Sequence, residues 1–230
     1  MNNDIVLNYL DELFPNPKCE LNYSKDYELL IATVLSAQTT DKSVNKVTEV
    51  LFKKYDSIEK LKDASIEDIS AIIKPIGTYN KKSIFVKEIA KYLYDNCNGI
   101  VPNSKNELVK MPGVGVKTAN VVLSNIYDYP AIAVDTHVSR VSKRLGFAKE
   151  SDDVSVIEKK LEKRFPKNRW SRLHHQLVLF GRYHCKAINP MCKDCKLKDI
   201  CKYKKKKIDW SSFIMDFLLA LCHQYLDLAD

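Results

Sequence analysis

Residues 111–123 read MPGVGVKTANVVL and join two helical patterns through a short turn that contains two glycines. Gly113 and Gly115 permit backbone angles and close approaches that side chains would block. The amides of such a turn, followed at once by a helix N-terminus, can point at a phosphate group. Many ordinary joints between helices also use glycines. The stretch therefore predicts a helix-turn-helix element, and it is compatible with contacts to a nucleic-acid backbone that read no base sequence.

The sequence on both sides of this turn is helical in pattern. Apolar residues recur at three- and four-residue spacing. Ser65 with Asp68 resembles a capping box, and Gly77 and Gly99 are suited to end helices. No segment shows convincing strand alternation. The sequence therefore predicts an all-α fold, with helical patterns over residues 27–37, 43–55, 82–96, 117–126, 134–145, 154–165 and 170–185.

The composition is that of a folded, basic protein. The chain has 230 residues, of which 45% are hydrophobic, enough for one large domain or two small ones. It carries 37 Lys and Arg against 29 Asp and Glu, and this net charge of +8 favours a polyanionic partner. The longest apolar run, around residues 213–221, contains Asp216 and is too short to span a bilayer. With no signal or transit peptide visible, we expect a cytoplasmic protein without membrane association.

Cys185, Cys192, Cys195 and Cys201 lie within seventeen residues in the spacing C-x6-C-x2-C-x5-C. Four thiolates in a loop with few apolar residues indicate a metal site that organises the loop. Structural zinc is one option, although zinc usually takes its ligands in two close pairs and only Cys192 and Cys195 form one here. A [4Fe–4S] cluster also needs four thiolates, and its larger core tolerates wider spacing.

Lys117 and Asp135 each stand near the start of a helical pattern. An exposed lysine is ordinarily just solvated, but a lysine amine from which a site excludes water can act as a nucleophile. Asp135 is suited to be a helix N-cap. A carboxylate in that position can also stabilise an oxocarbenium-like sugar. On these residues alone, a solvated lysine and a simple helix cap remain open beside a catalytic role.

Three separated stretches together resemble the endonuclease III family of DNA glycosylases. They are residues 112–123 with AVDTH at 133–137, LSAQTTD at 35–41, and the cysteine loop that follows GRYH at 181–184. The resemblance extends over roughly residues 4 to 207. Agreement of three distant motifs is far more specific than any one of them.

This resemblance implies two all-α parts with a DNA-binding cleft between them. Residues 20–129 would form a six-helix barrel with the helix-hairpin-helix, and residues 1–19 plus 130–207 would form the iron–sulfur cluster domain. Residues 208–230 lie beyond the resemblance and are expected to form an extra helical tail. We expect a monomer, with the apolar face of that tail packed on the body or in a dimer.

The resemblance also implies a reaction. The chain would be a bifunctional DNA glycosylase and AP lyase of base excision repair, which excises oxidised pyrimidines from duplex DNA and cleaves the strand by β-elimination. Lys117 would be the Schiff-base nucleophile, assisted by Asp135, and Gln38 would enter the space left by the flipped base. Cys185, Cys192, Cys195 and Cys201 would ligate a [4Fe–4S] cluster. Further DNA contacts would come from Thr78, Gly113, Gly115, His137, Lys186 and Lys193, together with Lys196 and Lys198.

Thr78 departs from the family pattern, which often has an apolar wedge at this position. The substrate implied is double-stranded DNA with damaged bases or abasic sites.

Two alternatives to this hypothesis make different predictions. The adenine-excising branch of the superfamily usually lacks a lysine at the position of Lys117 and carries an extra C-terminal domain. A non-catalytic DNA-binding module with structural zinc would tolerate replacement of Lys117.

Overall fold

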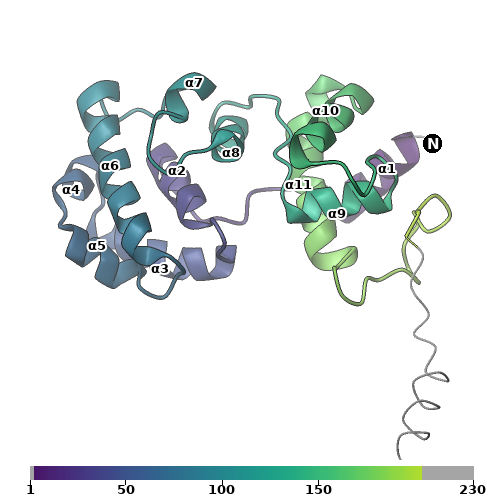
Figure 1. Cartoon of the computed structure of the whole chain (residues 1–230), viewed down its shortest axis with the longest axis horizontal. Coiled ribbons are helices and arrows are strands. Elements are labelled where there is room, and N and C mark those ends of the chain that lie inside the picture. Colours follow the sequence, from purple (N-terminus) through teal and green to yellow (C-terminus); the bar gives the residue numbers. More distant parts are fainter. Residues whose placement is uncertain (1–2, 204–230) are drawn as a thin grey trace, which may run out of the picture.

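The computed structural model of the chain describes residues 3–203, and every regular element in this range is a helix. The prediction of an all-α fold is therefore confirmed. Figure 1 shows two lobes side by side, one containing α2 to α8 and the other containing α1 and α9 to α11. We call them the barrel lobe and the cysteine lobe. The predicted tail, residues 208–230, lies outside the described residues.

The barrel lobe is built around a buried central helix. Its helices are α2 (Asp26–Leu35), α3 (Asp41–Lys54), α4 (Ile58–Asp63), α5 (Ile66–Ile73), α6 (Tyr79–Cys97), α7 (Lys105–Leu108) and α8 (Val116–Ile126). The sequence of α2 is apolar almost throughout, and all its residues after Asp26 are buried. A helix that is apolar on every side is stable only inside a core. It packs against α3, α6 and α8 and carries the chain directly into the turn around Gln38.

The cysteine lobe has an apolar core of its own. Its elements are α1 (Asn3–Leu13), α9 (Thr136–Arg144), α10 (Val154–Arg164), a short 3-10 helix (Lys167–Arg169), α11 (Trp170–Leu179) and a π-helical turn (Phe180–His184). The core joins Val6 and Leu10 of α1 to residues between Ile132 and Leu197. Helix α1 therefore packs against elements that come more than a hundred residues later in the chain.

Polar contacts hold α1 in this place. The Asp11 carboxylate accepts hydrogen bonds from Arg169 at 2.8 Å, Arg172 at 2.9 Å and Gln176 at 2.8 Å. Although burial alone would raise its pKa, these three donors outweigh burial and lower the pKa of Asp11 to about 2. The first helix is thereby tied to the 3-10 helix and to α11, which also lines the crevice between the lobes.

The helix boundaries differ from the sequence pattern where capping intervenes. The pattern over residues 134–145 becomes α9 only from Thr136, since Asp135 is its N-cap. The pattern over residues 170–185 is α-helical to Leu179 and then widens into the π-helical turn before Cys185. Such turns are uncommon and frequent at functional sites. Within residues 3–203, none of the helices has the length and apolar character needed to cross a membrane.

Candidate active site

The two glycines of the hairpin have different structural roles. Gly113 has a φ of +79°, and a Cβ there would lie 2.5 Å from Cδ2 of Phe85, so both the backbone and the packing require glycine. Gly115 is the N-cap of α8 in extended conformation, and a Cβ on it would meet nothing within 4 Å. Gly115 thus leaves the outer surface of the turn open to the approach of a ligand.

Lys117 lies in the first turn of α8, directly after this hairpin, and is exposed in the free protein. Asp135 lies on the other lobe, where its half-buried carboxylate accepts a hydrogen bond from the Val138 amide at 2.8 Å and caps α9. Both residues line a cavity of about 230 Å³. Gln38, from the turn after α2, lines the same cavity. The structure therefore brings together three predicted site residues from three separate elements.

Two adjacent histidines of α11, which the sequence reasoning missed, also line this cavity. His174 is buried, with its ring 4.9 Å from that of His175, and its Nδ1 has no hydrogen-bond partner within the described residues. Burial, followed by the neighbouring His175, lowers the pKa of His174 to about 3. The ring is therefore neutral near pH 7, and it lies close enough to Lys117 and Asp135 for their charges to act on it. The signal in the sequence that could have predicted these cavity residues is a pair of adjacent histidines inside an apolar helical stretch.

The turn that carries Gln38 is conformationally strained. Gln38 has a φ of +56°, in the left-handed region that side-chain-bearing residues seldom adopt. Beside it lies a second hollow, lined by Gln38, His137 and Arg182 among others. Arg182 forms an ion pair with Asp41 at 2.6 Å and another with Glu20, joining the cysteine lobe to the barrel lobe. His137 is half-buried, and burial lowers its pKa.

The other predicted DNA contacts lie apart from Lys117. Thr78 is exposed at the N-cap of α6, with a φ of +57°, and does not line the cavity. Lys186 and Lys193 are exposed on the cysteine loop, which we define as residues 185–203. Lys196 of the same loop is paired with Glu12 of α1 at 2.6 Å, so its charge is partly neutralised.

The four cysteines of the loop line one small cavity of about 70 Å³. Burial, and then the nearness of the other three sulfurs, raises the pKa of Cys195, and burial likewise raises that of Cys201. Four thiolates so placed need a strongly positive group among them to remain ionised together. Four cysteine sulfurs are, in kind, the ligand set of a metal centre. Among residues 3–203, however, there is no group of three or more His, Cys, Asp or Glu side chains that could hold a single metal ion.

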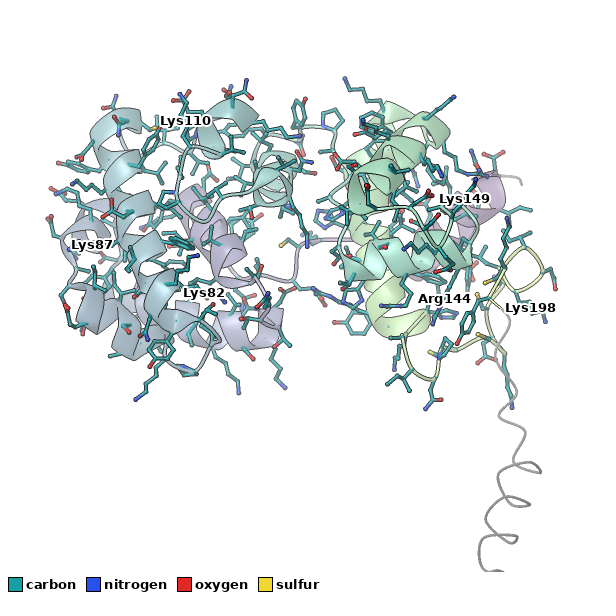
Figure 2. All side chains as sticks on the ribbon, in the orientation of Figure 1. Lys82, Lys87, Lys110, Arg144, Lys149 and Lys198 are labelled. Atoms are coloured by element: carbon teal, nitrogen blue, oxygen red, sulfur yellow. The ribbon has the colours of Figure 1, made fainter. Side chains whose placement is uncertain are left out.

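Arg144, at the end of α9, fastens the cysteine loop to that helix, and Figure 2 labels it beside the loop. Its Nη1 donates to the carbonyl of Lys186 at 2.7 Å and approaches Sγ of Cys185 at 3.4 Å. Its own carbonyl accepts from the Lys202 amide at 2.8 Å, and its guanidinium stacks 3.9 Å from the Tyr203 ring. One side chain therefore links both ends of the loop to the helix that Asp135 caps.

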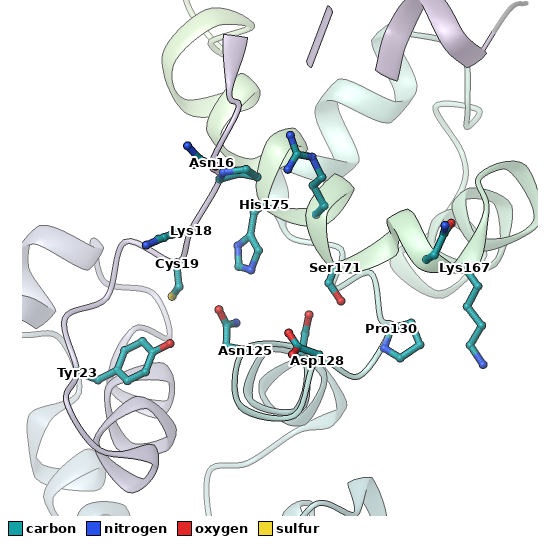
Figure 3. Close-up of a pocket in the computed structure, with 14 residues that line it drawn as sticks. Asn16, Lys18, Cys19, Tyr23, Asn125, Asp128, Pro130, Lys167, Ser171 and His175 are labelled. Atoms are coloured by element: carbon teal, nitrogen blue, oxygen red, sulfur yellow. The ribbon is translucent and has the colours of Figure 1, made fainter. Parts of the chain in front are cut away.

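A larger hollow of about 1030 Å³ adjoins the cavity that holds Lys117 and shares Lys18, Cys19 and His175 with it. In Figure 3, His175 points from α11 toward the space between the linker that carries Cys19 and the end of α8, near Asn125. The lining is largely polar in residue type. The crevice between the lobes therefore has open space on both sides of His175.

Comparison with known proteins places this arrangement in a family. Residues 31–167 match the HhH-GPD superfamily of base excision DNA repair proteins. The chain is 46% identical over 204 residues to endonuclease III of Bacillus subtilis, covering 89% of this chain and 93% of that protein. It is 43% identical over 201 residues to endonuclease III of Escherichia coli, covering 87% and 95%.

Solved structures agree with these sequence matches. A trapped covalent intermediate of an endonuclease III with DNA superposes with a TM-score of 0.83 at 46% identity, covering 88% of this chain and 96% of that one. A non-covalent endonuclease III–DNA complex gives 0.82 at 48% identity, covering 86% and 92%. A thermostable thymine-DNA glycosylase, 22% identical with a TM-score of 0.77, shares the fold. On this combined similarity of sequence and structure, the chain belongs to the endonuclease III family of the HhH-GPD superfamily.

Proposed function

We propose that this protein excises oxidised pyrimidines from duplex DNA and then cleaves the strand by β-elimination through a Schiff base on Lys117. As a member of the endonuclease III family, the chain is a DNA glycosylase with AP lyase activity. The observation that carries the proposal is the single cavity shared by Lys117, Asp135 and Gln38. The trapped covalent complex of a related protein with DNA supports a covalent step of the same kind here.

The proposed reaction begins with a nucleotide turned out of the duplex, since its anomeric carbon is inaccessible within the stack. The neutral Lys117 amine forms a bond to that carbon as the bond to the damaged base breaks. The amine passes a proton to the departing base, and ring opening gives an iminium ion. Solvent water then takes a proton from the adjacent carbon, and the electron pair left there expels the 3′ phosphate. Asp135 stabilises the cationic sugar. His174 adds a polar, uncharged wall near both groups, because burial keeps it neutral.

We assign DNA binding to both lobes. The hairpin amides at Gly113 and Gly115 would hold a phosphate, and Gln38 and Thr78 would enter the duplex beside the extruded nucleotide. His137, Lys186 and Lys193 would extend the contact onto the cysteine lobe. The partner is double-stranded DNA with damaged bases or abasic sites, bound by a monomer. The net charge of +8 supports a polyanionic partner.

We also propose that Cys185, Cys192, Cys195 and Cys201 hold a [4Fe–4S] cluster. Such a cluster would take all four thiolates as ligands around a core that is larger than one ion. When bound, the cluster cross-links the loop and supplies the positive charge that four thiolates need. The protein's own contribution is Arg144, which fastens the loop to α9 and so presents Lys186 and Lys193 outward.

The test is borohydride trapping on a duplex that contains one oxidised pyrimidine. The wild-type protein should give a covalent protein–DNA adduct, and Lys117→Gln should give none while still binding DNA. Lys18→Gln is a matched control, because Lys18 lines the same cavity and carries the same charge. It should trap normally. A substantial adduct from Lys117→Gln would show that another amine is the nucleophile, and Lys18 would be the first to examine.

A further inference from the structure

Helix α6 carries a buried lysine in its first turn. Lys82 is only 3% exposed, and Figure 2 labels it within the barrel lobe. Its Nζ donates to the carbonyl of Ala37 at 2.8 Å and to Oγ1 of Thr39 at 3.0 Å. Burial lowers its pKa, and within residues 3–203 no carboxylate is paired with it. A buried charge without an ion-pair partner costs stability, so this lysine is expected to serve something other than stability.

Lys82 touches two strained turns at once. Gln38 and Thr78 both have left-handed backbones, with φ of +56° and +57°, which is unusual for any residue other than glycine and more so for a β-branched one. The side chain of Lys82 binds the residues immediately before and after Gln38. Its backbone amide, like that of Lys81, donates to the carbonyl of Thr78 at 3.1 Å, as in any first helical turn, and this places Lys82 directly after the Thr78 turn. Strained conformations persist where the surroundings determine them, and the Lys82 side chain ties the Gln38 turn to the start of the helix that Thr78 caps.

We propose that Lys82 is a positioning residue for nucleotide flipping, which sets the distance and direction between Gln38 and Thr78. The proposal rests on the proposed function, in which these two side chains enter the same duplex. Without the two Nζ hydrogen bonds, the Ala37–Thr39 turn is free to relax toward right-handed backbone angles, and Gln38 would then point elsewhere. Burial excludes Lys82 as a direct phosphate contact. Lys82 also does not line the cavity of Lys117, so it is not a second nucleophile.

A purely structural role makes a different prediction about stability. Lys82→Met keeps the length of the side chain and removes the charge and the donors. Because the charge is buried and unpaired, the urea midpoint of Lys82→Met should be unchanged or higher than that of the wild type. Its activity on duplex DNA should nevertheless fall. A residue that merely holds the fold together would lose stability and activity in parallel.

The experiment compares two substrates, duplex DNA with one abasic site and the same strand without its complement. Borohydride trapping on the single strand needs the chemistry of Lys117 but no opening of a duplex. We expect Lys82→Met to trap single-stranded substrate within about twofold of the wild type, since the reacting groups are untouched. Its single-turnover rate on the duplex should fall roughly tenfold or more, as expected for displaced positioning groups.

Two further variants make the comparison specific. Thr39→Val removes one acceptor of Lys82, and should reduce the duplex rate in the same direction but less. Its effect should not add to that of Lys82→Met, because both remove the same contact. Lys81→Met is the control, since Lys81 is exposed, adjacent and equally charged. It should leave the ratio of duplex to single-strand rates unchanged.

Each outcome is decisive. An unchanged ratio in Lys82→Met, an equal loss on both substrates, or a parallel loss of stability would overturn the positioning role. If Lys82→Met fails to fold, an unchanged ratio in Thr39→Val overturns it instead. Absence of any adduct from the wild type on either substrate would be a failure of the proposed function, and the role of Lys82 would fall with it.

Discussion

Asp135 combines a structural contact and a proposed chemical task in one carboxylate. Its hydrogen bond with the Val138 amide caps α9, and it faces the cavity of Lys117 from the opposite lobe. Asparagine caps helices about as well as aspartate, whereas alanine cannot accept the bond and typically costs about 0.5–2 kcal/mol. The two tasks can therefore be separated by choosing the replacement.

We predict that Asp135→Asn keeps the unfolding free energy of the wild type within a few tenths of a kcal/mol, while Asp135→Ala loses about 1 kcal/mol. Both should excise the base about a hundredfold more slowly in single-turnover experiments, because the carboxylate is gone in each. Asp135→Asn should bind DNA as well as or better than the wild type, since it removes a negative charge. Full activity in Asp135→Asn would reduce Asp135 to a helix cap.

Substitutions at the two hairpin glycines should separate an effect on folding stability from an effect on DNA binding. Gly113→Ala places a methyl 2.5 Å from the Phe85 ring at a positive φ, so the variant should lose about 1–3 kcal/mol of unfolding free energy. Gly115→Ala meets no protein atom within 4 Å and should fold normally. Its methyl nevertheless stands where a phosphate would approach, so its affinity for DNA should fall. Urea unfolding and DNA titration measure the two effects. Normal binding by Gly115→Ala would remove the hairpin from the interface.

Single residues also mark the limit of what could be predicted from sequence. The stretches around Lys117, Asp135 and Gln38 are recognisable because each is a short motif, and these residues do line one cavity. Lys82 and His174 could not be found in that way. The partners of Lys82 lie more than forty residues away, and His174 becomes buried only when α11 packs in the folded protein. Tertiary contacts of this kind leave no local pattern in the sequence.

At the scale of elements, α11 carries a buried histidine that makes stability depend on pH and that lines the cavity of Lys117. Its buried His174 has a pKa of about 3, against an ordinary value of 6.5. Because the unfolded chain takes up this proton first, the stability is complete above pH 6.5 and declines as the pH falls from 6.5 toward 3. His175 is half-buried, and burial lowers its pKa as well. Helix α11 therefore resists protonation at two successive positions.

We predict that the unfolding free energy of the wild type falls by about 2 kcal/mol between pH 6.5 and pH 5 on account of His174, at about 1.4 kcal/mol per pH unit. His174→Gln should remove most of this dependence, and His175→Gln should remove less. Urea unfolding of the three proteins at several pH values measures the slopes. Equal slopes in wild type and His174→Gln would mean that His174 is accessible to protons in the folded state.

Helix boundaries were predictable only in part, for reasons that differ between elements. The pattern over residues 154–165 matches α10 within a residue, since an apolar stripe and an Asp153 cap agree there. Helix α6 begins at Tyr79, three residues before its apolar pattern, because Thr78, in a left-handed conformation, is its N-cap. The π-helical turn at Phe180–His184 has no signature in hydrophobic spacing. Local propensity describes regular helices well and their strained ends poorly.

At the scale of the whole molecule, the cavity of Lys117 forms between two lobes, each of which has its own apolar core. Lys117 belongs to the barrel lobe and Asp135 to the cysteine lobe, and neither lobe contains the site alone. Arg182 reaches from the cysteine lobe to Asp41 and to Glu20 in the linker. Helix α1 contacts the cysteine loop through two side chains. Tyr9 donates to the carbonyl of Asp194, and Glu12 is paired with Lys196. The cysteine loop is therefore part of the framework that supports the site.

This dependence leads to a prediction about the cysteines. Cys192→Ser should lose iron and visible absorption and unfold at lower urea, because the proposed cluster would lose one of its four ligands. Cys97→Ser is the matched control, since Cys97 ends α6 in the barrel lobe, far in sequence from the loop. It should keep its iron and its colour. Unchanged iron content in Cys192→Ser would show that the ligand assignment is wrong.

The loop should also determine how strongly DNA binding depends on salt. Each phosphate contact contributes about 0.9 to the slope of log affinity against log salt concentration. If the cluster presents Lys186 and Lys193 to the backbone, the intact protein with both changed to glutamine should have a slope smaller by roughly 2. Cys192→Ser should lose a similar amount, because its loop no longer holds those lysines in place. An unchanged slope in the double lysine variant would confine DNA binding to the hairpin and the barrel lobe, and the cluster would then support the fold alone.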